Sequence, residues 1–182
     1  MARLSDAASE PNRVWARGFG VTVRPLVRAD LEDPGIQRAL RDGIERNFEG
    51  DLPPGQPAAE CYAILARQVL VGTLTLRRDV PCAGAVVFDC VAIVPAHRGH
   101  AYGARALMAA ERRLRAAAYF ARVPRTNGRG LYFMLRCGYA PAAPPAAAVE
   151  PDGGATWFRR GSRLAAPAAA GRRRATPRGA SG

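Results

Sequence analysis

The stretch Val91-Ala-Ile-Val-Pro95-Ala-His-Arg98-Gly-His-Ala-Tyr-Gly103-Ala-Arg-Ala-Leu-Met108 carries the most structural information in this sequence. An almost continuously apolar strand is predicted to end at Pro95, and the turn that follows opens a helix near Gly103. The first turn of a helix has unpaired amide groups and the positive end of the helix dipole. Small residues there let a phosphate group approach the backbone closely, and Arg98 adds a fixed positive charge. These features predict an anion-binding turn without identifying the anion.

Outside this stretch, the hydrophobic pattern predicts a mixed α/β layer in which strands and helices do not alternate strictly. The predicted strands cover residues 21–26, 61–66, 69–76, 85–94, 119–123, 139–142 and 155–160. Predicted helices begin near Asp30, at Gly103 and at Asn127, and the last two run to about residues 118 and 137. Asp30 and Asn127 are candidate caps, because their side chains accept hydrogen bonds from the free amides of a first helical turn. Gly138 suits the left-handed position that often ends a helix.

The chain length of 182 residues predicts one domain with tails. We expect residues 1–18 to form a flexible leader and residues 19–161 to form the folded domain. Residues 162–182 are rich in Arg and Ala without periodicity, which predicts a disordered tail.

The formal net charge is +12, and the chain contains no Lys, so all 27 basic residues are Arg. Such a protein attracts polyanions, from nucleic acids to a small phosphorylated cofactor. No apolar run approaches the ~20 residues that span a bilayer, and the N-terminus lacks the apolar segment of a signal peptide. The four cysteines are widely spaced, which argues against a zinc site or a disulfide framework. We therefore expect a cytoplasmic protein with no membrane partner and no metal.

The turn Arg98-Gly-His-Ala101-Tyr-Gly103 resembles the acetyl-CoA loop of the GNAT superfamily of N-acetyltransferases. That loop has the pattern Gln or Arg, then x-x-G-x-G/A, and this chain departs from it at Ala101, where Gly is preferred. The turn lacks the Gly-Lys-Ser/Thr ending of a Walker loop and the three spaced glycines of a dinucleotide fingerprint. A second segment, Asn127 to Tyr139, resembles the family pattern N-x-x-A-x-x-F/L-Y-x-x-x-G-F, with Gly130 in the small-residue place.

The resemblance covers about residues 20–160 and implies a GNAT-type fold. Its central, mostly antiparallel twisted sheet would be flanked by helices, with a splayed gap between the fourth and fifth strands, here 85–94 and 119–123. It implies acetyl-CoA as the acyl donor. The cofactor-binding residues that it implies are Val91, Ala92, Ile93, Arg98, Gly99, His100, Ala101, Tyr102, Gly103, Ala104, Asn127, Gly130 and Phe133.

Asp89 is the candidate general base, because it is the only acid inside an apolar strand and burying an unpaired charge is costly. The alternatives are an Asp that is ion-paired with an Arg or that is exposed at a strand bulge. Glu45 and Glu60 are more distant candidates. The general acid is unassigned, because Met134 occupies the place where the family often has a Tyr, and Tyr132 is predicted to point elsewhere.

The sequence thus predicts an N-acetyltransferase that transfers an acetyl group from acetyl-CoA to a primary amine by direct attack. The alternative is a nucleic-acid-binding or interaction protein on a catalytically degenerate GNAT fold. The acceptor would be a small-molecule or peptide amine, and the early acidic residues Glu45, Glu49, Asp51 and Glu60 would suit a cationic one. Nucleic acid could bind through the basic tail, and the protein could be a monomer or a homodimer.

Overall fold

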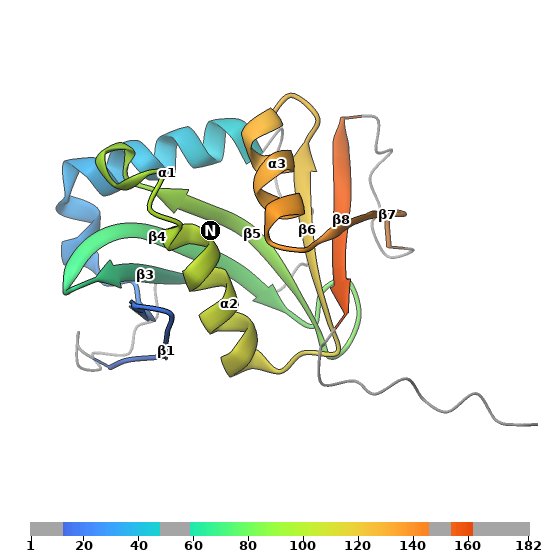
Figure 1. Ribbon diagram of the computed structural model, residues 1–182, viewed down its shortest axis with the longest axis horizontal. Helices are drawn as coiled ribbons and strands as arrows, with labels where there is room; N and C mark the ends of the chain where they lie inside the picture. The colour runs from blue at the N-terminus through green and yellow to red at the C-terminus, as the bar shows by residue number, and fades with distance from the viewer. Residues whose placement is uncertain (1–12, 48–58, 146–153, 162–182) are drawn as a thin grey trace, which may run out of the picture.

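The computed structural model describes residues 13–47, 59–145 and 154–161, and these fold around one twisted sheet (Figure 1). The strands of this part of the chain are β1 (Ala16–Gly18), β2 (Val21–Pro25), β3 (Glu60–Ala66), β4 (Val69–Arg78), β5 (Ala85–Ile93), β6 (Ala118–Pro124), β7 (Ala140–Ala142) and β8 (Ala155–Gly161). The helices are α1 (Pro34–Asn47), α2 (Tyr102–Leu114) and α3 (Gly128–Arg136), with the 3₁₀ turns η1 (Arg28–Glu32) and η2 (Pro95–His97).

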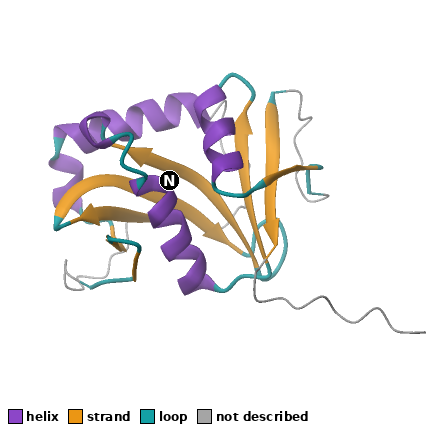
Figure 2. Ribbon diagram, viewed as in Figure 1, coloured by secondary structure: helices purple, strands orange, loops and turns teal. Residues whose placement is uncertain are grey.

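The sheet has the strand order β1-β2-β3-β4-β5-β6-β8-β7, and the pairing is antiparallel everywhere except between β5 and β6. Helix α2 crosses one face of the sheet (Figure 2). On that face it packs into the main core with Leu74, Leu76 and Phe88. The opposite face carries α1, whose Ala39 packs against Cys90 and Ala92. This arrangement confirms the predicted mixed α/β, mostly antiparallel fold.

The parallel pair β5–β6 is short, and this opens the sheet. The two strands pair only from Ala85 with Ala118 to Phe88 with Ala121, and beyond that point they part. Across β4, Leu76 pairs with Phe88 and Thr75 with Cys90, so Asp89 is an extra residue in β5. A bulge of this kind bends its strand and ends pairing. The predicted splay between these strands is therefore present, and it begins at the bulge.

Strand β1 lies inside the range that the sequence assigned to a flexible leader. Its Ala16 is buried, and the neighbouring Trp15 stacks on Tyr62 with ring centroids 4.1 Å apart. The folded domain therefore begins before residue 19. Residues 1–12 and the predicted tail, 162–182, lie outside the described residues.

The cap of α1 corrects the prediction for Asp30. Both oxygens of Asp30 pair with Arg24 at 2.6 and 2.7 Å, and one also accepts from the amide of Val27. Asp33 caps α1 instead, because its Oδ1 accepts from the amide of Ile36 at 2.9 Å. The predicted helix 103–118 is also shorter than expected, since Arg115 adopts the left-handed conformation and ends α2.

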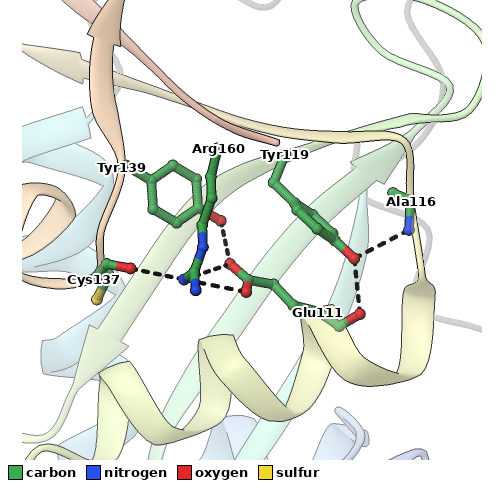
Figure 3. Close-up of polar contacts among 6 residues, drawn as sticks. All are labelled: Glu111, Ala116, Tyr119, Cys137, Tyr139 and Arg160. Carbon is green, nitrogen blue, oxygen red and sulfur yellow. Dashed lines mark hydrogen bonds and ion pairs between the residues drawn. The ribbon is translucent and has the colours of Figure 1, made fainter. Parts of the chain in front are cut away.

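A buried polar cluster joins the ends of α2 and α3 to β6 and β8 (Figure 3). Its centre is Glu111, whose carboxylate accepts from the Tyr139 hydroxyl at 2.7 Å and pairs with Arg160 at 3.3 Å. Arg160 also donates to the carbonyl of Cys137 at 2.7 Å, and the Tyr119 hydroxyl donates to the carbonyl of Glu111 at 2.8 Å. We call these residues the Glu111 cluster. It fixes the two helices whose N-termini border the gap in the sheet.

Candidate active site

A cavity of about 510 Å³ occupies the gap where β5 and β6 part. On the α2 side its walls include Val91, Gly103 and Phe133. On the α1 side they include Ala39 and Ala92. Because residues from both faces line it, the cavity spans the thickness of the sheet.

The structure brings nearly all of the predicted site residues to this cavity. Its lining includes the candidate base Asp89 and every predicted cofactor residue except His100. His100 is exposed, its Nδ1 lies 3.0 Å from the carbonyl of Arg98, and its ring stacks on Tyr102.

The turn between η2 and α2 presents free backbone amides. The amides of His97 and Arg98 bond to Val94 and Pro95, and the helical ladder resumes where Arg105 bonds to Ala101. Within the described part of the chain, the six amides of residues 99–104 donate to no backbone or side-chain group. Such a row of amides at a helix N-terminus suits a phosphate group.

Two small residues shape this turn. Gly99 and Ala101 both have positive φ, at +85° and +58°, and the second is an uncommon conformation for a residue with a side chain. A Cβ atom at Gly103 would lie 3.2 Å from Val91 and 3.4 Å from Phe133. Gly103 therefore keeps α2 close to β5 and keeps the cavity open.

The Arg98 side chain is directed toward α1. Its Nε donates to the carbonyl of Ile93 at 3.0 Å, and its Nη2 pairs with Asp42 of α1, also at 3.0 Å. The guanidinium thus ties the turn to α1 and to the end of β5, in addition to placing positive charge beside the turn.

The exposed backbone of β5 alternates in direction. The amide of Val94 bonds to Val71 on β4, so the alternating antiparallel ladder also directs the main chain of Ala92 toward β4. The amides of Val91 and Ile93 then point to the other side, into the gap. Of the predicted residues in this strand, Val91 and Ile93 therefore offer amide donors to a ligand, whereas Ala92 only lines the cavity.

The far wall is set by the start of α3. Asn127 caps this helix, because its Oδ1 accepts from the amide of Gly130 at 2.9 Å. Gly130 has no room for a side chain, since a Cβ atom there would lie 2.6 Å from Asn127 and 2.8 Å from Val123. The family pattern prefers Ala at this place, and the close approach explains why this chain has Gly.

Asp89 is ion-paired, which is one of the alternatives that the sequence left open. Its two oxygens accept from Nε and Nη2 of Arg77 at 2.8 and 2.6 Å, and the Asp89 side chain is only 6% exposed. Burial raises the pKa of the Asp89 carboxyl, while the adjacent guanidinium acts to lower it. Sequence reasoning missed Arg77, because the predicted strand 69–76 ends one residue before it, whereas β4 runs to Arg78.

Of the other candidate groups, Met134 and Tyr132 line the cavity, whereas Glu60 does not. Met134 is buried, and Tyr132 is 61% exposed with its hydroxyl accepting from Arg136. Glu60 is paired with Arg78 at 2.7 Å, outside the cavity lining. The side chain of Glu45 falls outside the described part of the structure, as do Glu49 and Asp51. In the described ranges, no three His, Cys, Asp or Glu side chains gather as a metal site would require.

An antiparallel sheet that parts beside a row of free amides is the architecture of acyl-CoA N-acyltransferases. The chain belongs to the acetyltransferase (GNAT) family, whose model matches residues 25–139. No protein with a curated description matches this chain. None of the helices in the described ranges has the length and apolarity needed to cross a membrane.

Solved structures share this fold at low sequence identity. An acetyltransferase from Thermus thermophilus is 17% identical with a TM-score of 0.61, over 79% of this chain and 97% of that one. A GNAT acetyltransferase from Bacillus anthracis is 12% identical with a TM-score of 0.61, over 81% and 98%. The spermidine N-acetyltransferase of Vibrio cholerae, solved with CoA and spermine, is 17% identical with a TM-score of 0.58, over 80% and 97%.

Proposed function

We propose that this protein is an acetyl-CoA-dependent N-acetyltransferase that transfers the acetyl group to a primary amine by direct attack. The observation that carries the proposal is the row of six free amides beside the parted strands. Family membership supports acetyl transfer, and a structural neighbour binds CoA together with an amine.

In this proposal the pyrophosphate of acetyl-CoA binds the amides of residues 99–104, including that of His100. The pantetheine arm runs between β5 and α3, where Val91 and Ile93 offer amides and Asn127 and Phe133 form the opposite wall. An amide directed at the thioester oxygen stabilises the negative charge that develops there during attack.

The acceptor amine attacks the thioester carbonyl, so that a carbon–nitrogen bond forms and the carbon–sulfur bond breaks. The amine proton needs an acceptor, and we assign that role to Asp89. Arg77 occupies one lone pair of each carboxylate oxygen, which leaves a second lone pair on each. The CoA sulfur leaves with the bonding electrons as a thiolate. Thiols are far more acidic than alcohols, and a cysteine thiol has a reference pKa of about 8.5, so we assign no general acid to the departing thiolate.

We place this reaction in the cytoplasm with a small-molecule or peptide amine as acceptor. All four cysteines are free thiols, as expected in a reducing compartment. The family acts on amines, and the Vibrio cholerae neighbour is a spermidine N-acetyltransferase.

Two glycines in the first turns of helices provide a matched test. A Cβ atom at Gly103 would meet the cavity wall, whereas one at Gly128 would have no atom within 4 Å. We expect calorimetry to show saturable acetyl-CoA binding by the natural protein and by Gly128→Leu, and strongly weakened binding by Gly103→Leu. Absence of acetyl-CoA and CoA binding by the natural protein would reject the proposed function.

A further inference from the structure

One side of α3 presents two cations and an aromatic ring at the cavity. Arg129, Tyr132 and Arg136 follow one another at intervals of three and four residues, which places them on the same side of a helix. All three are exposed, and all three line the cavity. We call Arg129, Tyr132 and Arg136 the α3 row. It is the part of α3 that a ligand in the cavity can reach from solvent.

The two arginines of the α3 row have no acidic partner in the described part of the chain. Residues 112–149 contain seven Arg and no Asp or Glu. Within the described ranges, neither Arg129 nor Arg136 takes part in an ion pair. Two guanidinium groups without a carboxylate attract an anion, and their planar sets of N–H donors match the oxygens of a phosphate group.

Tyr132 is held in place beside one of these cations. Its hydroxyl accepts from Nη1 of Arg136 at 3.1 Å, and the guanidinium carbon of Arg136 lies 5.7 Å from the centre of the ring. The Tyr132 residue nevertheless stays 61% exposed, so much of its ring is open to a ligand. An exposed aromatic ring beside cations suits a nucleotide, because the base stacks on the ring while the phosphate meets the cations.

The α3 row lies close to the turn that we propose for the pyrophosphate. A Cβ atom at Gly103 would lie 3.4 Å from the ring of Phe133, which shows that α3 approaches the first turn of α2. In CoA, the pyrophosphate is followed by a ribose that carries adenine and a 3′-phosphate. When the pyrophosphate binds residues 99–104 and the pantetheine arm enters the cavity, this nucleoside end remains at the cavity mouth, where the α3 row is exposed.

We infer that the α3 row binds the adenosine 3′-phosphate end of acetyl-CoA, with Arg129 and Arg136 on the 3′-phosphate and Tyr132 against the adenine. This inference rests on the proposed function and adds a selection between acyl donors. The amides of residues 99–104 bind a pyrophosphate that CoA shares with dephospho-CoA, which lacks only the 3′-phosphate. Selection of acetyl-CoA over acetyl-dephospho-CoA therefore depends on the α3 row.

The first test measures the dissociation constants of acetyl-CoA and acetyl-dephospho-CoA for the natural protein by calorimetry in 100 mM salt. We expect acetyl-CoA to bind at least about tenfold more tightly, because charge-assisted hydrogen bonds to the 3′-phosphate are lost with the other donor. Equal binding of the two donors would overturn the inference and leave the proposed function standing. Failure of both donors to bind would reject the proposed function and the inference with it.

The second test repeats the comparison with Arg129→Gln and Arg136→Gln. We expect each variant to lower the ratio of the two dissociation constants about threefold or more, with little change for acetyl-dephospho-CoA. Arg105→Gln is the matched control, because it removes the same charge from the first turns of α2, outside the cavity lining. Thermal melting checks that the variants fold. An unchanged ratio in both α3 variants, or a ratio lost in Arg105→Gln instead, would contradict the assignment of the 3′-phosphate.

The third test separates the adenine contact from the phosphate contact. Tyr132→Ala removes the stacking ring, so we expect both donors to bind about threefold to tenfold more weakly. Leu135→Ala is the control, because Leu135 is a 52% exposed residue of the same helix that does not line the cavity. Unchanged binding of both donors by Tyr132→Ala, or equal losses in the two variants, would contradict the placement of the adenine.

Discussion

Among the glycines that line the cavity, Gly130 leaves the least room for a side chain. A Cβ atom there would lie 2.6 Å from Asn127 and 2.8 Å from Val123, which are both cavity residues. We expect Gly130→Ala to destabilise the fold by about 1–3 kcal/mol and to weaken acetyl-CoA binding, because Asn127 must move. Denaturant unfolding and calorimetry measure the two effects. Gly128→Ala is the control, since its Cβ meets open space, and equal behaviour of the two variants would contradict the prediction.

Cys137 should be a slow nucleophile despite being a free thiol. The Cys137 side chain is half-buried. Burial, which is the larger cause, and the nearby negative charge of Glu111 raise the pKa of its thiol to about 11. A raised pKa lowers the thiolate fraction below pH 11, so the alkylation rate should rise about tenfold per pH unit between pH 8 and 10. Site-resolved mass spectrometry after maleimide labelling measures this rate. The exposed Cys82 should react much faster at pH 8, and comparable labelling of both would contradict the prediction.

At the residue scale, the sequence predicts the local parts of the site better than the long-range ones. The turn from Arg98 to Gly103 and the Asn127 cap depend on neighbouring residues, so their chemistry can be read from a short window. The Arg77–Asp89 pair joins residues 12 positions apart across a hairpin. Its formation depends on the β4–β5 register and on the bulge, and no pattern in the sequence specifies either.

Among the elements, α2 and α3 depend on the Glu111 cluster for their relative placement. The Glu111 side chain is 11% exposed, and that of Arg160 is 12% exposed. Glu111→Leu leaves a buried guanidinium without its carboxylate, so we expect a loss of about 3 kcal/mol in the free energy of unfolding. Denaturant unfolding measures this loss.

The double variant Glu111→Leu/Arg160→Met removes both charges and should recover much of that stability. Arg113→Ala, on the exposed face of the same helix, should change the free energy by less than about 0.5 kcal/mol. If Glu111→Leu behaved like Arg113→Ala, the Glu111 cluster would have no stabilising role.

Strands with a strong hydrophobic pattern could be predicted from the sequence, whereas the short strand β1 and the cap of α1 could not. The apolar run 85–94 predicts β5 closely, because a strand that is covered on both faces has few polar positions. Strand β1 has three residues, too few to show an alternation. For α1 the sequence predicted Asp30 as the cap, which was wrong. Asp33 caps the helix, and the Asp30 carboxylate is engaged by Arg24.

For the whole molecule, a cavity that spans the sheet predicts the kinetic mechanism. In the proposed function, acetyl-CoA occupies the α2 side while the amine approaches from the α1 side, so both substrates are bound together. We expect intersecting lines in double-reciprocal plots of the initial rate against the concentration of either substrate. We also expect no acetylated protein after incubation of the enzyme with acetyl-CoA alone. Intact-mass spectrometry checks the second point. An acetyl group on Cys90, the most buried thiol of the cavity lining, would contradict direct attack.

The bulge has a consequence for insertions and deletions in this chain. Phe88 and Cys90 pair with the adjacent residues Leu76 and Thr75, so the strand contains one residue more than its partner. A chain without Asp89 would keep every later side chain on its present face, and its core pattern would be unchanged. Without the bulge, β5 would lose its bend, and we expect it to pair with β6 along its full length and to close the gap in the sheet. Deletion of the single Asp89 codon would then convert a sheet with a gap into a continuous one.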